Sequence, residues 1–190
     1  NRRRLHAAII VLLTALAYAG SFRGGFISDD VQEIPENPLL RSLAPANLRA
    51  IATSFEAGIN YIPLHTLSLT LDYQLWGLAP AGYHATNLVL HVVNALLVYL
   101  LLLRLGEPAA AACTVALLWA VHPVQVESVA WISERKNLLS TLFFLLAFLT
   151  YLRFSAQQRT RSYLLLLGLF VCALVSKLNT IALPAVMVAY

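Results

Sequence analysis

The chain has 190 residues, of which 59% are hydrophobic and only 12% are charged, and its mean hydropathy is +0.73. Soluble domains are about 45–50% apolar and about 25% charged, so this composition excludes an ordinary soluble domain. It also excludes a disordered chain, because disordered chains are polar and rich in charge. The net charge of +4 comes from only 13 Lys and Arg, whose longest run is Arg2-Arg3-Arg4, so we predict no nucleic-acid partner. We therefore predict an all-α, multi-spanning membrane protein.

Six apolar runs follow one another along the chain. A helix needs about 20 apolar residues, within a range of roughly 17–25, to cross the bilayer core. The first run begins after the three arginines and ends in Ala17-Tyr18-Ala19-Gly20, which also resembles a signal-peptide cleavage site. The later runs favour a retained anchor over a cleaved peptide. The predicted spans are 5–22, 83–105, 109–121, 137–154, 163–175 and 178–190.

A long polar interval, residues 23–81, separates the first two predicted spans and holds most of the acids and prolines. Within it, Ala46–Phe55 and Pro63–Trp76 carry apolar residues at mixed three- and four-residue spacings. That pattern is typical of short amphipathic helices that lie on a membrane surface or against a helical bundle.

The third predicted span is interrupted by His122-Pro123. Proline disfavours helix in the preceding residue and cannot donate its own backbone hydrogen bond. The run 109–121 would give only about 20 Å of helix. Either the helix continues past a kink, or the break lies below the membrane surface.

Charge predicts the orientation. If the N-terminus is cytoplasmic and the spans alternate, the cytoplasmic side holds seven arginines and a single acid, Glu107. The other side then holds the remaining eight of the nine acids together with six bases. Short cytoplasmic loops rich in arginine agree with the positive-inside rule. The arginines on that side are Arg2, Arg3, Arg4, Arg104, Arg153, Arg159 and Arg161.

The first polar group on the non-cytoplasmic side is Asp29-Asp30, one short loop after the first span. Two adjacent carboxylates can bind a divalent cation, accept a proton from an attacking hydroxyl, or simply lie in water as part of a turn. Like charges this close raise the pKa of one carboxyl, which suits a general base. Cys113 and Cys172 lie inside apolar runs, and His122 and Glu127 do not have a metal-ligand spacing, so we predict no metal site from the remaining residues.

The second polar group begins at the proline break and ends in Glu134-Arg135-Lys136-Asn137. Charge near hydrocarbon is costly, so this cluster indicates a function, although its acids and bases can also pair as interfacial anchors. As a site, Arg135 and Lys136 would neutralise a phosphate while His122 or Glu127 binds or orients a polar group.

Two further groups have competing interpretations. Lys177, between two apolar runs, either extends to the interface or supplies another phosphate contact. His84 and His91 share a helical face, as do Asn87 and Asn94, and such a stripe favours helix packing over chemistry.

The whole pattern resembles the GT-C-type membrane domain of the transmembrane and tetratricopeptide-repeat protein group, whose animal members are O-mannosyltransferases of the endoplasmic reticulum. The resemblance covers about residues 20–184. It is carried by Phe26-Ile27-Ser28-Asp29-Asp30, by Gly58-Ile59-Asn60-Tyr61-Ile62-Pro63-Leu64, by His122-Pro123-Val124-Gln125-Val126-Glu127-Ser128-Val129-Ala130-Trp131-Ile132-Ser133-Glu134-Arg135-Lys136, and by Ser176-Lys177 with Leu183-Pro184.

The resemblance implies a glycosyltransferase that moves a sugar from a polyprenyl-phosphate carrier to a hydroxyl of a protein or glycan at the exoplasmic face. It implies that Asp29 and Asp30 are the catalytic carboxylates. The donor and its lipid phosphate would be bound by His122, Glu127, Arg135, Lys136 and Lys177. It further implies additional spans and tetratricopeptide repeats beyond residue 190, and a bacterial cytoplasmic or endoplasmic-reticulum membrane.

Two other functions fit the same residues. A catalytically inactive relative would hold a lipid-linked sugar or a partner protein without turnover. A transporter is disfavoured because the charged groups collect at one face, whereas transport sites lie near the midplane.

Overall fold

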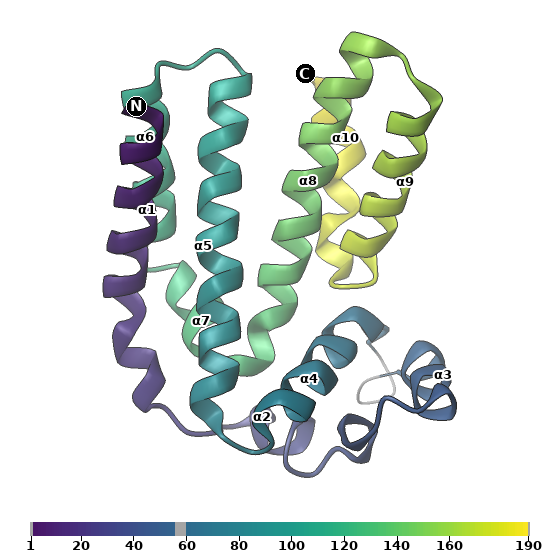
Figure 1. Ribbon diagram of the computed structural model, residues 1–190. Coiled ribbons are helices and arrows are strands. Elements are labelled where there is room, and N and C mark those ends of the chain that lie inside the picture. Colours follow the sequence, from purple (N-terminus) through teal and green to yellow (C-terminus); the bar gives the residue numbers. More distant parts are fainter. Residues whose placement is uncertain (1, 56–59, 190) are drawn as a thin grey trace.

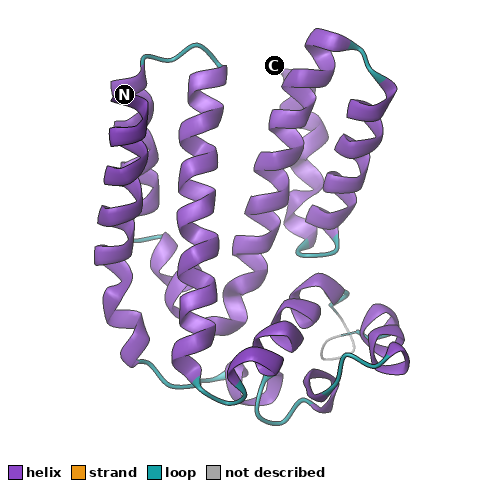
Figure 2. Ribbon diagram, viewed as in Figure 1, coloured by secondary structure: helices purple, strands orange, loops and turns teal. Residues whose placement is uncertain are grey.

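The computed structural model describes residues 2–55 and 60–189. Glu56, the motif residues Gly58 and Ile59, and Tyr190 at the end of the last predicted span lie outside the described residues. Helices joined by short loops make up the fold (Figure 2). The prediction of an all-α, membrane-type fold is therefore confirmed.

Among the described residues, three helices are long and apolar enough to cross a membrane. They are Arg2–Arg23, in which α1 (Arg2–Tyr18) continues into the 3₁₀ turn η1 (Ala19–Arg23), α5 (Pro80–Arg104), and Ile132–Gln157, in which the 3₁₀ turn η3 (Ile132–Glu134) leads into α8 (Arg135–Gln157). The other three predicted spans correspond to shorter helices: α6 (Ala109–Ala120), α9 (Thr160–Leu174), and the 3₁₀ turn η4 (Leu178–Ala182) followed by α10 (Leu183–Ala189).

These helices form two groups that stand side by side, α1 with α5 and α6, and α8 with α9 and α10 (Figure 1). Helices α5 and α8 run in the same direction, and α1, α6 and α9 run opposite to them (Figure 1). Inside the first group, Ala95, Ala112 and Ala116 are buried against Ile10 and Tyr99. Small side chains of this kind allow close approach of helix backbones in a membrane, where packing rather than water exclusion drives helix association.

The polar interval folds against one end of the bundle (Figure 1). Its elements are α2 (Asp29–Glu33), the 3₁₀ turn η2 (Pro38–Arg41), α3 (Pro45–Thr53) and α4 (Pro63–Trp76). The helices α3 and α4 match the two amphipathic segments expected from the sequence. Each begins at a proline, whose fixed φ and missing N–H suit the first turn of a helix.

The break at His122-Pro123 separates α6 from α7 (Gln125–Ala130). Helix α6 stops short of the bundle end that α1 and α5 reach (Figure 1), so the structure favours a break inside the bundle over a kinked continuation. The carbonyl oxygen of Ala120 accepts a hydrogen bond from Tyr18 Oη at 3.0 Å and lies 2.8 Å from Nε2 of the buried His91. These contacts satisfy a helix-end carbonyl that would otherwise lack a partner.

The alternation of helix direction separates the charged groups. The N-terminal ends of α2 and α8, with the loop after α9, lie at the end that carries the polar interval. Arg104 and Arg153, near the C-terminal ends of α5 and α8, lie at the opposite end. The two ends of the bundle therefore carry different charged groups. This distribution agrees with the one that the sequence predicted from alternating spans.

Candidate functional site

Asp29 and Asp30 open α2 but have different environments. Asp30 is fully buried, and its Oδ1 accepts hydrogen bonds from the backbone N of Ser133 at 2.8 Å and from the Ser133 hydroxyl at 2.6 Å. Its Oδ2 accepts a hydrogen bond from the backbone N of Ile27 at 3.1 Å. Asp29 is exposed and accepts a hydrogen bond from the Ser28 hydroxyl at 3.3 Å. Asp30 thus attaches the loop to η3, and Asp29 is the carboxylate that solvent and ligands can reach.

The residue before this pair has a strained backbone. Ser28 has a φ of 50° and a ψ of −122°. A residue with a side chain held in such a region costs on the order of 1–3 kcal/mol, and such residues cluster at binding and catalytic sites. The hydrogen bonds of Asp30 on the C-terminal side of Ser28 are well placed to hold this conformation.

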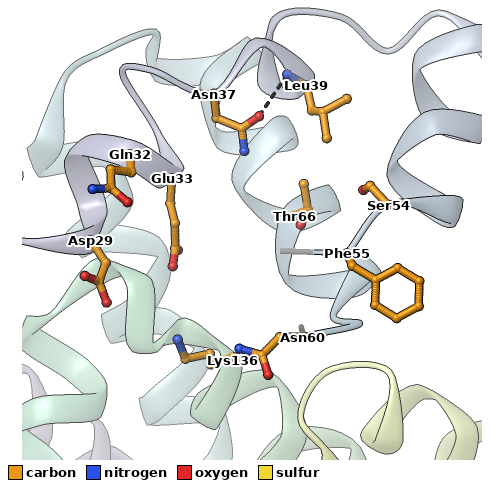
Figure 3. Close-up of a pocket in the computed structure, with 10 residues that line it drawn as sticks. All are labelled: Asp29, Gln32, Glu33, Asn37, Leu39, Ser54, Phe55, Asn60, Thr66 and Lys136. Carbon is orange, nitrogen blue, oxygen red and sulfur yellow. Dashed lines mark hydrogen bonds between the residues drawn. The ribbon is translucent and has the colours of Figure 1, made fainter. Parts of the chain in front are cut away.

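A cavity of about 440 Å³ opens in front of Asp29 (Figure 3). We call it the acidic cavity. Asp29 and Glu33 from α2 and Lys136 from α8 point toward one another across it (Figure 3). Glu33 also contacts the buried His65 of α4, with 3.0 Å between Oε2 and Nε2. The remaining lining residues are Gln32, Asn37, Leu39, Ser54, Phe55, Asn60 and Thr66.

The chain contains two lysines, and both lie beside the carboxylate of Glu134. Lys136 Nζ is 3.2 Å from Glu134 Oε1, and Lys177 Nζ is 3.5 Å from Glu134 Oε2. Asn137 bridges the group, because its Nδ2 donates to Glu134 Oε2 at 2.6 Å and its Oδ1 accepts from Lys177 Nζ at 2.5 Å. We call Glu134, Lys136 and Lys177 the lysine junction.

Two more cavities adjoin the lysine junction. The junction cavity, about 230 Å³, is lined by both lysines and shares Asn60 and Lys136 with the acidic cavity. The bundle cavity, about 460 Å³, shares Lys177 and Asn179 with the junction cavity. It continues between the helices, where its lining includes Val98, Trp119, Phe144 and Leu145. The three cavities therefore form a series from carboxylates, past two lysines, to a cavity lined by hydroxyl, amide and apolar side chains.

Arg135 points away from these cavities and is fully buried between α4, α5 and α8. Its guanidinium lies 2.6 Å from Asp72 Oδ2, and it donates to Asn87 Oδ1 at 2.6 Å, to Tyr83 O at 3.0 Å and to Ser68 O at 3.3 Å. Burial raises the pKa of the Asp72 carboxyl above its ordinary value, and the charge of Arg135 opposes that effect. Arg135 joins three helices behind the site.

His122 and Glu127 are also outside the three cavities. Both side chains are exposed, and His122 Nδ1 accepts a hydrogen bond from the backbone N of Val124 at 3.2 Å. His122 lines a separate, mostly apolar hollow beside Trp119. Of the predicted site residues, the structure thus brings together Asp29, Asp30, Lys136 and Lys177, with Arg135 behind them, and leaves His122 and Glu127 apart.

The polar stripe on α5 packs between helices. Asn94 Nδ2 donates to Leu138 O at 2.9 Å, and Asn87 Nδ2 donates to Val129 O at 3.3 Å. His84 and His91 are buried on the same helix. The expectation that this stripe packs between helices agrees with these contacts.

The sequence did not single out Glu33, Asn60 or Asp72 as part of the site. Asp72 could have been recognised from the sequence, because it is the one acid of the helix Pro63–Trp76. If that helix is buried, the carboxylate needs a partner. Over residues 2–55 and 60–189, no three His, Cys, Asp or Glu side chains are grouped so that they could hold a metal ion.

The chain is similar to proteins whose printed name is protein O-mannosyl-transferase. It is 35% identical to mouse TMTC1 across 97% of this chain and 22% of the relative, and 34% identical to human TMTC1 across 97% and 23%. Its identity to mouse TMTC3 is 35%, across 75% of this chain and 16% of the relative. The chain therefore spans less than a quarter of the length of these curated relatives. No protein-family model and no solved structure matches it.

The matched region contains Asp29, Asp30, the lysine junction and the Arg135 network in one all-α membrane-type fold. Taken with the sequence identity, these findings establish that the chain is, over most of its length, a homologue of the protein O-mannosyl-transferases TMTC1 and TMTC3.

Proposed function

We propose that the chain is part of the membrane domain of a GT-C-type O-mannosyltransferase, which moves a sugar from a polyprenyl-phosphate donor to a hydroxyl of a protein. The observation that carries the proposal is the order of the three cavities. A carboxylate, a pair of cations and a cavity with a partly apolar lining follow one another, and we match this order to an acceptor hydroxyl, a phosphate and the start of a lipid chain.

Asp29 is the general base in this proposal. The acceptor hydroxyl enters the acidic cavity, and Asp29 takes its proton as the oxygen attacks the anomeric carbon of the sugar. The bond from that carbon to the phosphate oxygen breaks, and the electron pair leaves with the polyprenyl phosphate. A positioned carboxylate typically contributes about 10²–10⁴-fold to such a step.

Lys136 and Lys177 hold the phosphate of the donor. Charge builds on the phosphate oxygen as the sugar leaves, and cations already in position stabilise it without having to reorganise. The lipid chain then extends into the bundle cavity, along Val98 and Phe144. A lipid donor explains why the site lies where the bundle meets the polar interval.

The other predicted residues act around this centre. Asp30 holds the loop that presents Asp29, and Arg135 holds the helix start that presents Lys136. His122 and Glu127 lie outside the three cavities, so we propose that they bind the donor or acceptor only at the periphery, beyond the described cavities. The bundle end with the polar interval faces the exoplasmic side of a bacterial or endoplasmic-reticulum membrane, the N-terminus is cytoplasmic, and the remaining spans and repeats lie outside this chain.

The test is transfer by the full-length protein from a polyprenyl-phosphate sugar to a hydroxyl acceptor. Asp29→Asn should lower kcat by about 10²-fold or more, because the amide cannot accept the proton. Glu36→Gln, which removes an exposed charge from the same loop, serves as the matched control. Wild-type turnover in Asp29→Asn would reject the assignment of Asp29 as the general base. Donor binding without turnover by the wild-type protein would favour a catalytically inactive protein that only holds a lipid-linked sugar or a partner protein.

A further inference from the structure

A further cavity lies at the end of the bundle opposite the acidic cavity, where α5 and α8 end (Figure 1). We call it the arginine cavity. Its volume is about 440 Å³, and both helices contribute to its wall. The lining residues are Arg104 from α5 and Leu149, Leu152, Arg153, Ala156 and Gln157 from α8.

The lining residues of α8 form one face of that helix, because they are spaced by three and four residues. The face changes in character along its length. Arg153 and Gln157, near the end of the helix, carry N–H donors, and Ala156 between them occupies little space. Leu149 lies four residues before Arg153, which is about 6 Å deeper along the helix axis. The face therefore offers donors at the end of the bundle and apolar side chains one turn further in.

Arg104, the last residue of α5, brings a second guanidinium to this cavity. Three residues earlier, Leu101 packs against the same apolar cluster as Leu152 of α8, so the two helices are joined just below the arginines. Both helices are long and apolar enough to cross a membrane, and the cavity lies at their ends. Two cations from different helices are thus held at the level where the bilayer core gives way to lipid head groups.

The protein does not neutralise these two cations within the described part of the chain. No described carboxylate forms an ion pair with Arg104 or Arg153. Glu107, the acid at this end, belongs to the loop from α5 to α6, which leads away from α8 (Figure 1). Arg159 and Arg161, after the end of α8, add further positive charge to the same end. The arginine cavity therefore favours an anion.

We propose that the arginine cavity binds the phosphate of an anionic membrane lipid. Guanidinium groups present paired N–H donors that match phosphate oxygens, and the amide of Gln157 supplies another donor. The acyl chains would follow Leu149 and Leu152 toward the bilayer interior. A free phosphate ion has the same head-group chemistry but gains nothing from these leucines. Basic cavities between membrane helices are known to bind anionic head groups. The site lies at the other end of the bundle from Asp29, so it is independent of the proposed function.

The experiment measures binding of phosphatidylglycerol to the full-length protein in a neutral detergent. Binding should be saturable. Phosphatidylcholine, which has no net charge, and inorganic phosphate, which has no acyl chains, should each bind about tenfold more weakly or less. Arg104→Gln and Arg153→Gln should each lower the affinity for phosphatidylglycerol by about tenfold, because each removes hydrogen bonds to a charged group.

Two matched variants separate a defined cavity from a general positive surface. Arg161→Gln removes the same charge at the same end but outside the cavity, so salt screening should limit its effect to less than about twofold. Ala156→Leu keeps every charge and fills the cavity, so it should weaken binding by about tenfold. Tm without lipid checks that each variant is folded.

Three results would overturn the inference. An equal loss of affinity in Arg161→Gln and Arg104→Gln, or unchanged binding in Ala156→Leu, would show a diffuse surface charge instead of a site. Inorganic phosphate that binds as tightly as phosphatidylglycerol would overturn the assignment to a lipid. A wild-type protein without saturable binding of phosphatidylglycerol would overturn the proposal as a whole.

Discussion

Ser133 donates two hydrogen bonds to the same oxygen of Asp30, one from its backbone N at 2.8 Å and one from its hydroxyl at 2.6 Å. Both residues are fully buried. The contact joins the first polar loop to the segment that begins α8, so the residue next to the proposed base is attached to the segment that carries the lysine junction. The loop that carries Asp29 and the segment that carries the lysine junction therefore hold each other in place.

Removing the Ser133 hydroxyl tests this link. Ser133→Ala keeps the backbone hydrogen bond but leaves a buried carboxylate with one donor fewer, which should cost about 1–3 kcal/mol of stability. We expect kcat to fall by about tenfold while KM for the donor changes little, because Asp29 is displaced relative to the acceptor.

Thr150→Ala is the matched control for Ser133→Ala. Thr150 donates to the Leu146 carbonyl within α8, remote from the site, at 2.7 Å. Its loss should alter neither kcat nor KM. An equal fall in kcat for both variants would mean that the Ser133 effect is a general loss of stability.

The pair formed by Arg135 and Asp72 predicts a non-additive effect on stability. Asp72→Ala leaves a buried guanidinium without its counter-charge, and breaking a buried pair in this way costs about 3–5 kcal/mol. The double variant Asp72→Leu with Arg135→Met removes both charges and should recover most of the loss. Thermal unfolding of the detergent-solubilised protein measures the difference as shifts in Tm.

Asp29→Ala provides the comparison. Removing this exposed carboxylate should lower activity with little change in Tm. The double variant also separates two roles for Arg135. Recovery of Tm together with retained donor binding identifies Arg135 as a positioning residue. Recovery of Tm with complete loss of donor binding would instead support direct contact with the donor phosphate.

Gly82 predicts a steric effect at the junction of α4 and α5. A Cβ atom at this position would lie 2.2 Å from Cγ of Trp76, so the indole would have to move. Gly82→Ala should therefore destabilise the protein by about 1–3 kcal/mol, as overpacking generally does. Gly168→Ala in α9, where a Cβ would meet nothing within 4 Å, should be neutral or stabilising because alanine favours helix.

Thermal unfolding of Gly82→Ala, Gly168→Ala and the double variant Gly82→Ala with Trp76→Ala measures this effect. Partial recovery of Tm in the double variant would confirm the contact with Trp76. Equal Tm values for the two single variants would contradict it.

The sequence predicted elements far better than contacts. Long apolar runs and prolines located α5, α8 and the break after α6, because length and backbone chemistry are local properties. The sequence also placed Asp29 and Lys136 on one side, since alternating helices carry residues to alternating ends. It could not tell that Asp30 and Arg135 are buried while their neighbours Asp29 and Lys136 face a cavity, because that division depends on which helix packs behind each residue.

The partner of Arg135 shows the limit most clearly. Asp72 lies on an amphipathic helix whose sequence is compatible with either a membrane surface or a bundle. Only the packing of α4 against α5 and α8 brings Asp72 within 2.6 Å of the guanidinium. Adjacent charges in the sequence therefore predicted where these residues gather but not which of them are buried.

Arg135 and Lys136 are consecutive residues that face different surroundings, one the interior of the protein and the other the acidic cavity. Successive residues of a helix differ by about 100° in direction. Deleting one residue after Ser133 would therefore bring Lys136 to the buried position of Arg135, and inserting one residue would bring Arg135 to the position of Lys136. Lysine has no planar fork with which to replace the guanidinium contacts to Asp72, Asn87 and Tyr83. Substitutions leave the spacing between Ser133 and Lys136 unchanged and affect one contact at a time. An insertion or deletion changes this spacing, so it would disrupt the buried contacts of Arg135 and the cavity position of Lys136 together.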